Sequence, residues 1–232
     1  ETGYISIDQF SIPTADEFHQ AAIRLKAYGM KKLILDLRNN GGGVLQSATM
    51  IADEFLPKGR IILKTKGRKE QEKIYYSTSG GELEGIDAVV LINAFSASAS
   101  EILAGALQDN DRAIIVGRRS YGKGLVQEDS PMRDGSNLRI TIARYYTPSG
   151  RCIQKPYSGN YDEYMKDEVR MEKGEMYHLD SSLYLDSLKF KTIGGRTVYG
   201  GGGITPDVFV PYDTTESSFY LTELLFSGAF QS

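Results

Sequence analysis

The chain has 232 residues, 41% of them hydrophobic, and a formal net charge of −3. This composition allows a sizeable folded core, and the charge argues against a nucleic-acid partner or an anionic membrane surface. The only cysteine, Cys152, excludes a disulfide within the chain. No stretch is apolar for long enough to span a bilayer, and no signal peptide is recognisable. Because the first residue is Glu1 rather than Met, we expect an excised or processed fragment.

The first quarter of the chain predicts strands and helices in alternation. The capping-box spacing of Thr14 and Glu17 predicts a helix start, and Gly29 predicts its end. The predicted order is a strand at Tyr4–Phe10, this helix, a buried strand at Leu33–Leu37, a glycine turn at Arg38–Gly43 and a helix from about Leu45 to Phe55.

The same order continues through the middle of the chain. The expected elements are paired strands at Arg60–Thr65 and Lys73–Ser77, a buried strand at Ala88–Ile92, a helix at Ser98–Leu107 and a strand at Ala113–Val116. Alternating strands and helices predict an α/β fold with a largely parallel central sheet and right-handed crossovers.

Beyond Gly124 the pattern is less regular. It predicts strands at Leu138–Tyr145 and Asp207–Val210, separated by a polar, tyrosine-rich segment from Tyr157 to Asp186. We expect a single domain over residues 1–232, with an α/β core at about 3–155 and a decorated C-terminal region at about 156–232.

A phosphate-binding loop is the first reading of Gly117 and Gly122-Lys123, which match the start of G-x-x-x-x-G-K-[ST]. Gly124 stands where the magnesium-binding hydroxyl is required. The following segment, Leu125 to Pro131, has no helical pattern that could place a helix N-terminus at a phosphate. The sequence therefore predicts no nucleotide partner.

A serine nucleophile with a lysine base is a second reading of Lys123. Three serines, Ser96, Ser98 and Ser100, stand at a predicted helix start, where backbone amides favour developing negative charge. One of them could equally be a simple helix cap. The two histidines, His19 and His178, fit surface or core positions better than a catalytic triad. A lysine can replace histidine as the base when its surroundings lower its pKa from ~10.4 towards 7.

Five stretches, in this order, resemble the C-terminal processing peptidases, also called tail-specific proteases. They are LILDLRNNGGG (33–43), NAFSASASEILAGALQDNDRAIIVG (93–117), YGKGLVQ (121–127), LRITIARYYTPSGRCIQ (138–154) and GGGITPDVFV (201–210). The resemblance spans nearly the whole chain and implies a crotonase-like α/β fold and a serine peptidase. It also implies protein or peptide substrates and no cofactor or metal. The implied location is the bacterial periplasm or a membrane, to which a segment outside this chain could anchor the protein.

The resemblance also implies site residues. The nucleophile falls on Ser98, the general base on Lys123 and the lysine-orienting glutamine on Gln127. The oxyanion hole combines the amide of Ala99 with one from Gly42 or Gly43, between which the sequence does not decide. Members of the family usually carry a PDZ domain, and we expect none within this chain.

Two other polar residues have simpler explanations, and one other function stays open. Asp36 could shape the glycine turn or make a structural hydrogen bond, and Glu101 suits the first turn of a helix better than a direct catalytic role. The alternative function is a non-catalytic ligand- or peptide-binding module of the same fold.

Overall fold

A five-stranded parallel sheet forms the centre of the computed structural model, which describes residues 1–78, 80–157, 159, 164, 170, 174–179 and 184–213. Its strand order is β1-β2-β5-β6-β11, and every neighbouring pair is parallel. The strands are β1 (Thr2–Ser6), β2 (Lys32–Asp36), β5 (Asp87–Ile92), β6 (Ala113–Gly117) and β11 (Val208–Phe209). This confirms the predicted α/β class and the largely parallel sheet.

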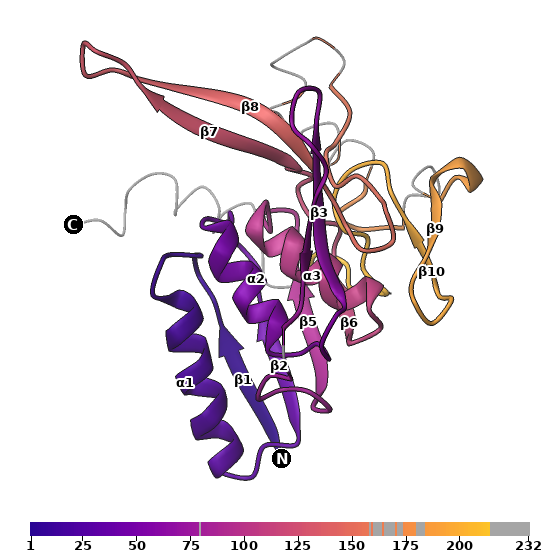
Figure 1. Cartoon of the computed structure of the whole chain (residues 1–232). Helices are drawn as coiled ribbons and strands as arrows, with labels where there is room; N and C mark the ends of the chain where they lie inside the picture. Colours follow the sequence, from indigo (N-terminus) through magenta and orange to yellow (C-terminus); the bar gives the residue numbers. More distant parts are fainter. Residues whose placement is uncertain are drawn as a thin grey trace, which may run out of the picture.

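In the described part of the chain, three helices pack beside this sheet: α1 (Thr14–Ala27), α2 (Leu45–Asp53) and α3 (Ala99–Asp109) (Figure 1). Helix α2 lies between α1 and α3. The small and aliphatic side chains of α3 let it sit in the middle of the molecule, and every residue of that helix is buried. Sheet residues such as Leu35 and Val90 complete one continuous apolar core. The serine-rich helix start is therefore anchored in the close-packed core.

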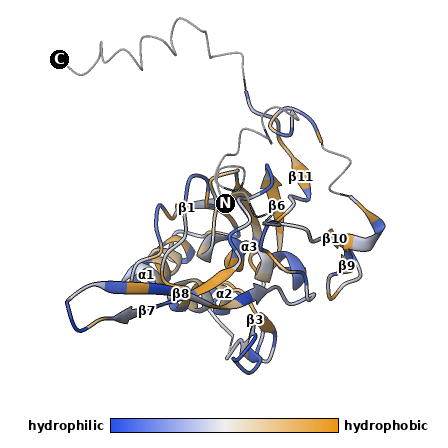
Figure 2. Ribbon diagram, turned by 90° about the horizontal axis from the view of Figure 1, so that it is seen from above, coloured by the Kyte–Doolittle hydropathy of each residue, from blue (hydrophilic) through white to orange (hydrophobic). Residues whose placement is uncertain are grey.

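A second sheet is antiparallel, with the order β4-β3-β8-β7. Its strands are β3 (Ile61–Gly67), β4 (Lys73–Tyr76), β7 (Leu125–Pro131) and β8 (Asn137–Tyr146). Beyond a register shift at Val126 and Gln127, β7 and β8 form an exposed hairpin that extends away from the body in both views (Figures 1 and 2). A short 3-10 helix (Asp186–Leu188) precedes the two-stranded ribbon of β9 (Lys189–Lys191) and β10 (Thr197–Tyr199).

Two local predictions need correction. The capping box at Thr14 is wrong, because the Thr14 hydroxyl instead accepts the Ser11 amide at 2.9 Å and donates to the Gln9 carbonyl at 3.1 Å. These contacts fold the preceding turn, and α1 begins without a side-chain cap. The first strand ends at Ser6 rather than Phe10. The segment after Gly124, which lacks helical periodicity as expected, is strand β7.

None of the helices in the described part of the chain is long and apolar enough to cross a membrane.

Shortening a core side chain of α3 tests this arrangement. Leu103 is 0% exposed, and we expect Leu103→Ala to lower the free energy of unfolding by about 2–5 kcal/mol because it leaves a cavity in a close-packed core. Ile12 is 83% exposed, so Ile12→Ala should change it by less than about 0.5 kcal/mol. Urea denaturation followed by circular dichroism measures both, and equal losses would contradict the assigned core.

Candidate active site

Three loops meet at one edge of the parallel sheet. Residues 38–43 follow β2, residues 93–98 follow β5 and residues 118–124 follow β6. Because these strands are parallel neighbours, their carboxyl ends lie at the same edge, where open α/β sheets commonly bind ligands. Residues that are far apart in the sequence are thus brought together by the sheet.

Hydrogen bonds tie the first loop to the second. The Asn40 carbonyl accepts the Ala97 amide at 3.0 Å and the Ser100 hydroxyl at 2.9 Å. Asn39 and Asn93 bind each other reciprocally, amide to side chain at 3.0 Å and side chain to side chain at 2.8 Å. The glycine turn is therefore held against the turn that carries Ser98.

Gly42 lies directly against Ser98. Its φ of +99° favours glycine, and a Cβ at this position would be 2.7 Å from the Ser98 Cβ and 2.9 Å from the Ala99 nitrogen. The Gly42 amide is already used, since it donates to the Asn40 side-chain oxygen at 2.8 Å. Only glycine leaves enough room for this contact. The Gly42 amide is not free to bind another acceptor.

Two other amides remain available in this region. Ala99 is the first residue of α3. Gly43 lies between Gly42 and Val44, both of which form backbone hydrogen bonds with Phe10. Neither of their N–H groups has a hydrogen-bond acceptor among the described residues. Unpaired amides beside a helix N-terminus can stabilise an anion, which is the role that the family resemblance implies for Ala99 and a glycine of the turn.

Ser98 lies between the loop that follows β5 and the first residue of α3. Its backbone conformation is unusual. Its φ is 55° and its ψ is −111°, a region that non-glycine residues rarely adopt and that costs about 1–3 kcal/mol. Its side chain is half-buried and therefore accessible from solvent. The sequence predicted the helix start here, but not this strain.

The Glu101 carboxylate connects the serine turn to the lysine loop. Its Oε2 accepts the Ser98 amide at 2.8 Å and the Lys123 amide at 2.9 Å. Its Oε1 accepts the Ser120 hydroxyl and the Gly122 amide, both at 2.6 Å. Because both amides bind the same oxygen, the backbones of Ser98 and Lys123 lie close together.

This carboxylate is completely buried. Burial raises the pKa of the Glu101 carboxyl, and the hydrogen bonds from its four donors oppose that effect. Sequence reasoning treated Glu101 as a helix-dipole residue and missed its role as the connection between two loops. The spacing Ser98-x-x-Glu101 was the available signal, because a glutamate three residues into a helix can reach back to the amide at its start.

Close backbone packing explains the two glycines that flank Lys123. A Cβ at Gly122, where φ is +92°, would be 2.9 Å from the Lys155 Cβ, and one at Gly124 would be 2.5 Å from the Gln154 nitrogen. The Lys155 amide donates to the Gly122 carbonyl at 2.9 Å. The lysine backbone is therefore held between Glu101 on one side and residues 153–155 on the other.

The side chain of Lys123 is half-buried and makes no hydrogen bond or ion pair with any described residue. The structure thus brings the backbones of Ser98 and Lys123 together without a hydrogen bond between the hydroxyl and the amine. Gln127 lies four residues farther on, exposed at the base of the hairpin. Within the described chain its side chain does not contact Lys123 by a hydrogen bond.

A family model for Peptidase family S41 matches residues 1–159, which include the three loops with Ser98, Glu101 and Lys123. The chain belongs to Peptidase family S41. It is 44% identical over 160 residues to a carboxy-terminal-processing protease of Bartonella bacilliformis, a match that covers 66% of this chain and 36% of the relative. A carboxyl-terminal-processing protease of Synechocystis is 42% identical over 153 residues, with 66% and 35% covered.

A solved structure, the photosystem II D1 C-terminal processing protease, resembles this S41 chain with a TM-score of 0.65 and 28% identity. The likeness covers 90% of this chain and 42% of that one. The chain thus matches about a third of the length of these curated relatives.

A buried ion cluster holds the lysine loop of this S41 chain from its other side. Glu175 receives bidentate hydrogen bonds from Arg119, at 2.7 and 2.8 Å, and from Arg170, at 2.7 and 3.0 Å. Arg170 also donates to the carbonyls of Arg119 and Ser120. Burial alone would raise the pKa of Glu175, but the two guanidinium groups lower it to about 2.

The remaining polar candidates have structural partners. Asp36 accepts hydrogen bonds from Tyr4, at 2.7 Å, and from Arg38. Burial opposes ionisation, yet these bonds hold the pKa of Asp36 below its usual value. His19 is 2.7 Å from Glu54 on the helical side of the molecule, and His178 is exposed. No group of three or more His, Cys, Asp or Glu that could hold a metal occurs among the described residues.

Replacing Glu101 by glutamine tests the connection between the loops. The new NH₂ group would face two of the four donors, so we expect Glu101→Gln to lower the free energy of unfolding by about 2–4 kcal/mol. Glu17→Gln, at an exposed position of α1, is the matched control and should be nearly neutral. Urea denaturation measures both variants, and an unchanged Glu101→Gln would show that the carboxylate does not hold the loops.

The Glu175 cluster predicts a pH dependence. A folded-state pKa near 2, below the usual 4.5, contributes stability that is complete above pH 4.5 and is lost as the pH falls towards about 2. We expect Glu175→Gln to flatten this acid limb of the unfolding free energy. Glu128→Gln, on the exposed strand β7, should leave the limb as steep as in the unmodified chain. Urea titrations at a series of pH values decide between these outcomes.

Proposed function

We propose that this S41 chain is the catalytic part of a serine endopeptidase that uses Ser98 as nucleophile and Lys123 as general base. One observation carries the proposal: a single Glu101 oxygen binds the amides of both residues. Two amides without an acceptor in the described structure, from Ala99 and Gly43, lie in the same region. A nucleophile, a base and anion-binding donors are the parts that acyl transfer needs.

The reaction proceeds through an acyl-enzyme. The neutral Lys123 amine takes the proton of the Ser98 hydroxyl while its oxygen bonds to the scissile carbonyl carbon. The carbonyl oxygen becomes an oxyanion, which accepts hydrogen bonds from the amides of Ala99 and Gly43. The protonated amine then gives its proton to the departing peptide nitrogen as the C–N bond breaks. Water repeats the sequence on the ester and releases the carboxylic acid.

Gly43 rather than Gly42 is our choice for the second oxyanion donor. The Gly42 amide is occupied by Asn40, while the Gly43 amide has no acceptor in the described chain. Gly42 keeps a different role, because it is the residue whose missing side chain leaves room beside Ser98. An oxyanion-hole donor of this kind typically contributes ~3–4 kcal/mol to transition-state stabilisation.

Substrate binding completes the dyad in this proposal. No hydrogen bond joins the Ser98 hydroxyl and the Lys123 amine within the described structure, although their backbones are tied together. Catalytic hydrogen bonds are often long in a free enzyme and tighten when substrate is bound. The four single bonds of the lysine side chain allow its amine to swing towards the serine, and Gln127 can orient it if the hairpin base closes.

The proposed substrates are proteins cleaved near their C-termini, and the proposed fold is crotonase-like. The names of the relatives, carboxy-terminal-processing proteases, support the substrate class, and the strand–helix alternation around a parallel sheet supports the fold. A binding module without catalysis is less consistent with a strained serine placed beside unpaired amides.

Replacing either dyad residue tests the mechanism. We expect Ser98→Ala and Lys123→Ala each to lower hydrolysis of fluorescently labelled casein by at least about 10³-fold, because each removes a covalent or proton-transfer step. Lys66→Ala, an exposed lysine on β3, should keep full activity. Circular dichroism checks that all three variants fold. Turnover retained by Lys123→Ala would mean that another group is the base.

A further inference from the structure

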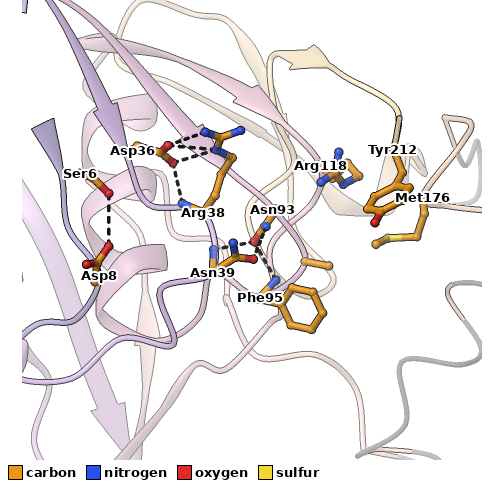
Figure 3. Close-up of a pocket in the computed structure, with 11 residues that line it drawn as sticks. Ser6, Asp8, Asp36, Arg38, Asn39, Asn93, Phe95, Arg118, Met176 and Tyr212 are labelled. Carbon is orange, nitrogen blue, oxygen red and sulfur yellow. Dashed lines mark hydrogen bonds and ion pairs between the residues drawn. The ribbon is translucent and has the colours of Figure 1, made fainter. Parts of the chain in front are cut away.

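A cavity of about 730 Å³ opens beside the candidate active site at the carboxyl edge of the parallel sheet. Its wall includes Asn39, Phe95 and Arg118, one from each of the three loops that carry the catalytic candidates (Figure 3). Each loop passes from the cavity to the site within a few residues: Asn39 precedes Gly42, Phe95 precedes Ser98 and Arg118 precedes Lys123. The cavity wall and the candidate site are thus only a few residues apart along each of the three loops.

Arg118 brings an uncompensated positive charge to the cavity wall. It forms no salt bridge with any carboxylate in the described part of the chain, and its one hydrogen bond runs from Nη1 to the Val210 carbonyl at 3.2 Å. Its buried Nε has no hydrogen-bond partner. A buried guanidinium nitrogen without a partner is costly, because the N–H loses water and gains nothing in exchange.

The second arginine of the cavity is in a different state. Arg38 is paired with Asp36 through Nη2–Oδ2 at 2.6 Å and Nε–Oδ1 at 3.0 Å. Burial lowers the pKa of the Arg118 guanidinium. The charge of Arg38 also lowers this pKa, and Tyr212 opposes both effects. An arginine nevertheless stays protonated at neutral pH. Arg118 is consequently the cation of this wall whose charge a ligand could satisfy.

We propose that this cavity is a carboxylate-binding subsite for the peptide substrate, with Arg118 as the group that binds the carboxylate. The inference rests on the proposed function, since it assumes that a peptide reaches the cavity from Ser98. A guanidinium can donate parallel N–H bonds to a carboxylate through its terminal nitrogens, and Nη2 of Arg118 has no acceptor among the described residues. The carboxylate can be the C-terminus of the peptide or an acidic side chain.

The surroundings of Arg118 favour an apolar residue beside that carboxylate. Tyr212 and Met176 lie next to Arg118 in Figure 3, and the Arg118 guanidinium is 5.5 Å from the centre of the Tyr212 ring. The exposed ring of Phe95 also lines the cavity and lies beside Asn39 and Asn93 in Figure 3. Asp8 lies at the opposite end of the cavity, where its carboxylate repels an anion. The ligand's negative end is thus directed to Arg118.

Binding to the inactive Ser98→Ala chain tests the subsite without requiring hydrolysis. The probes are short alanine–leucine peptides labelled with fluorescein at the N-terminus, and fluorescence anisotropy gives their Kd. One pair differs only in a free or an amidated C-terminus, and a second, amidated pair differs in one internal Glu or Gln. We expect the acidic member of at least one pair to bind about tenfold more tightly, and the pair that responds identifies the source of the carboxylate.

Arg118→Gln in the same background should remove that tenfold difference while binding of the uncharged peptides stays unchanged. Arg118→Lys keeps the charge but loses the bidentate geometry, so it should keep only part of the preference. Arg24→Gln, an exposed arginine of α1, makes the same change in net charge and should keep all of it. Circular dichroism confirms the fold of each variant.

Two outcomes would overturn the subsite: equal binding of acidic and uncharged peptides, or a preference that survives Arg118→Gln. Both can be told apart from a failure of the proposed function. If the proposed function were wrong, the unmutated chain would hydrolyse neither these peptides nor casein, whatever the anisotropy showed. Hydrolysis without any carboxylate preference would leave the peptidase intact and reject the role of Arg118.

Discussion

The buried carboxylate of Glu101 is the interaction on which the candidate site depends. It accepts hydrogen bonds from the serine turn on one oxygen and from the lysine loop on both. A buried carboxylate is stable only when such donors compensate for lost water, so the two loops and the charge depend on each other. Moving either loop would leave part of this buried carboxyl group without hydrogen-bond donors.

Rigid surroundings make that connection specific. Glu101 belongs to α3, whose residues are all buried, so its side chain has little freedom to follow a moving loop. On the far side, Glu175 and its two arginines hold the backbone of residues 119 and 120. The lysine loop is therefore fixed at both ends, while the Lys123 side chain has no hydrogen-bonded partner among the described residues. This combination suits a group that must change its protonation state during a reaction.

Backbone strain and glycine contacts add a second constraint. Ser98 has a positive φ because the chain must turn sharply from the loop after β5 into α3, and the energy of that turn is offset by the packing of the helix. The same turn lies so close to residue 42 that only glycine fits there. The free amides of Ala99 and Gly43 result from this geometry, since no described residue is placed to accept a hydrogen bond from either.

The sequence by itself determined the α/β class, the order of the strands and helices that build the core, and the residue types at positions 42, 98 and 123. Hydrophobic periodicity and glycine spacing are local properties, and they carry this information directly. Only the tertiary structure decided that Thr14 folds a turn instead of capping a helix, that residues 125–131 pair in a projecting hairpin with Gln127 exposed at its base, and that Glu101 links two distant loops. It also placed Arg118 in the wall of a cavity beside the site, with no carboxylate partner among the residues that the structure describes. These features depend on contacts between residues far apart in the chain, and such contacts are set by how the strands assemble rather than by any local pattern.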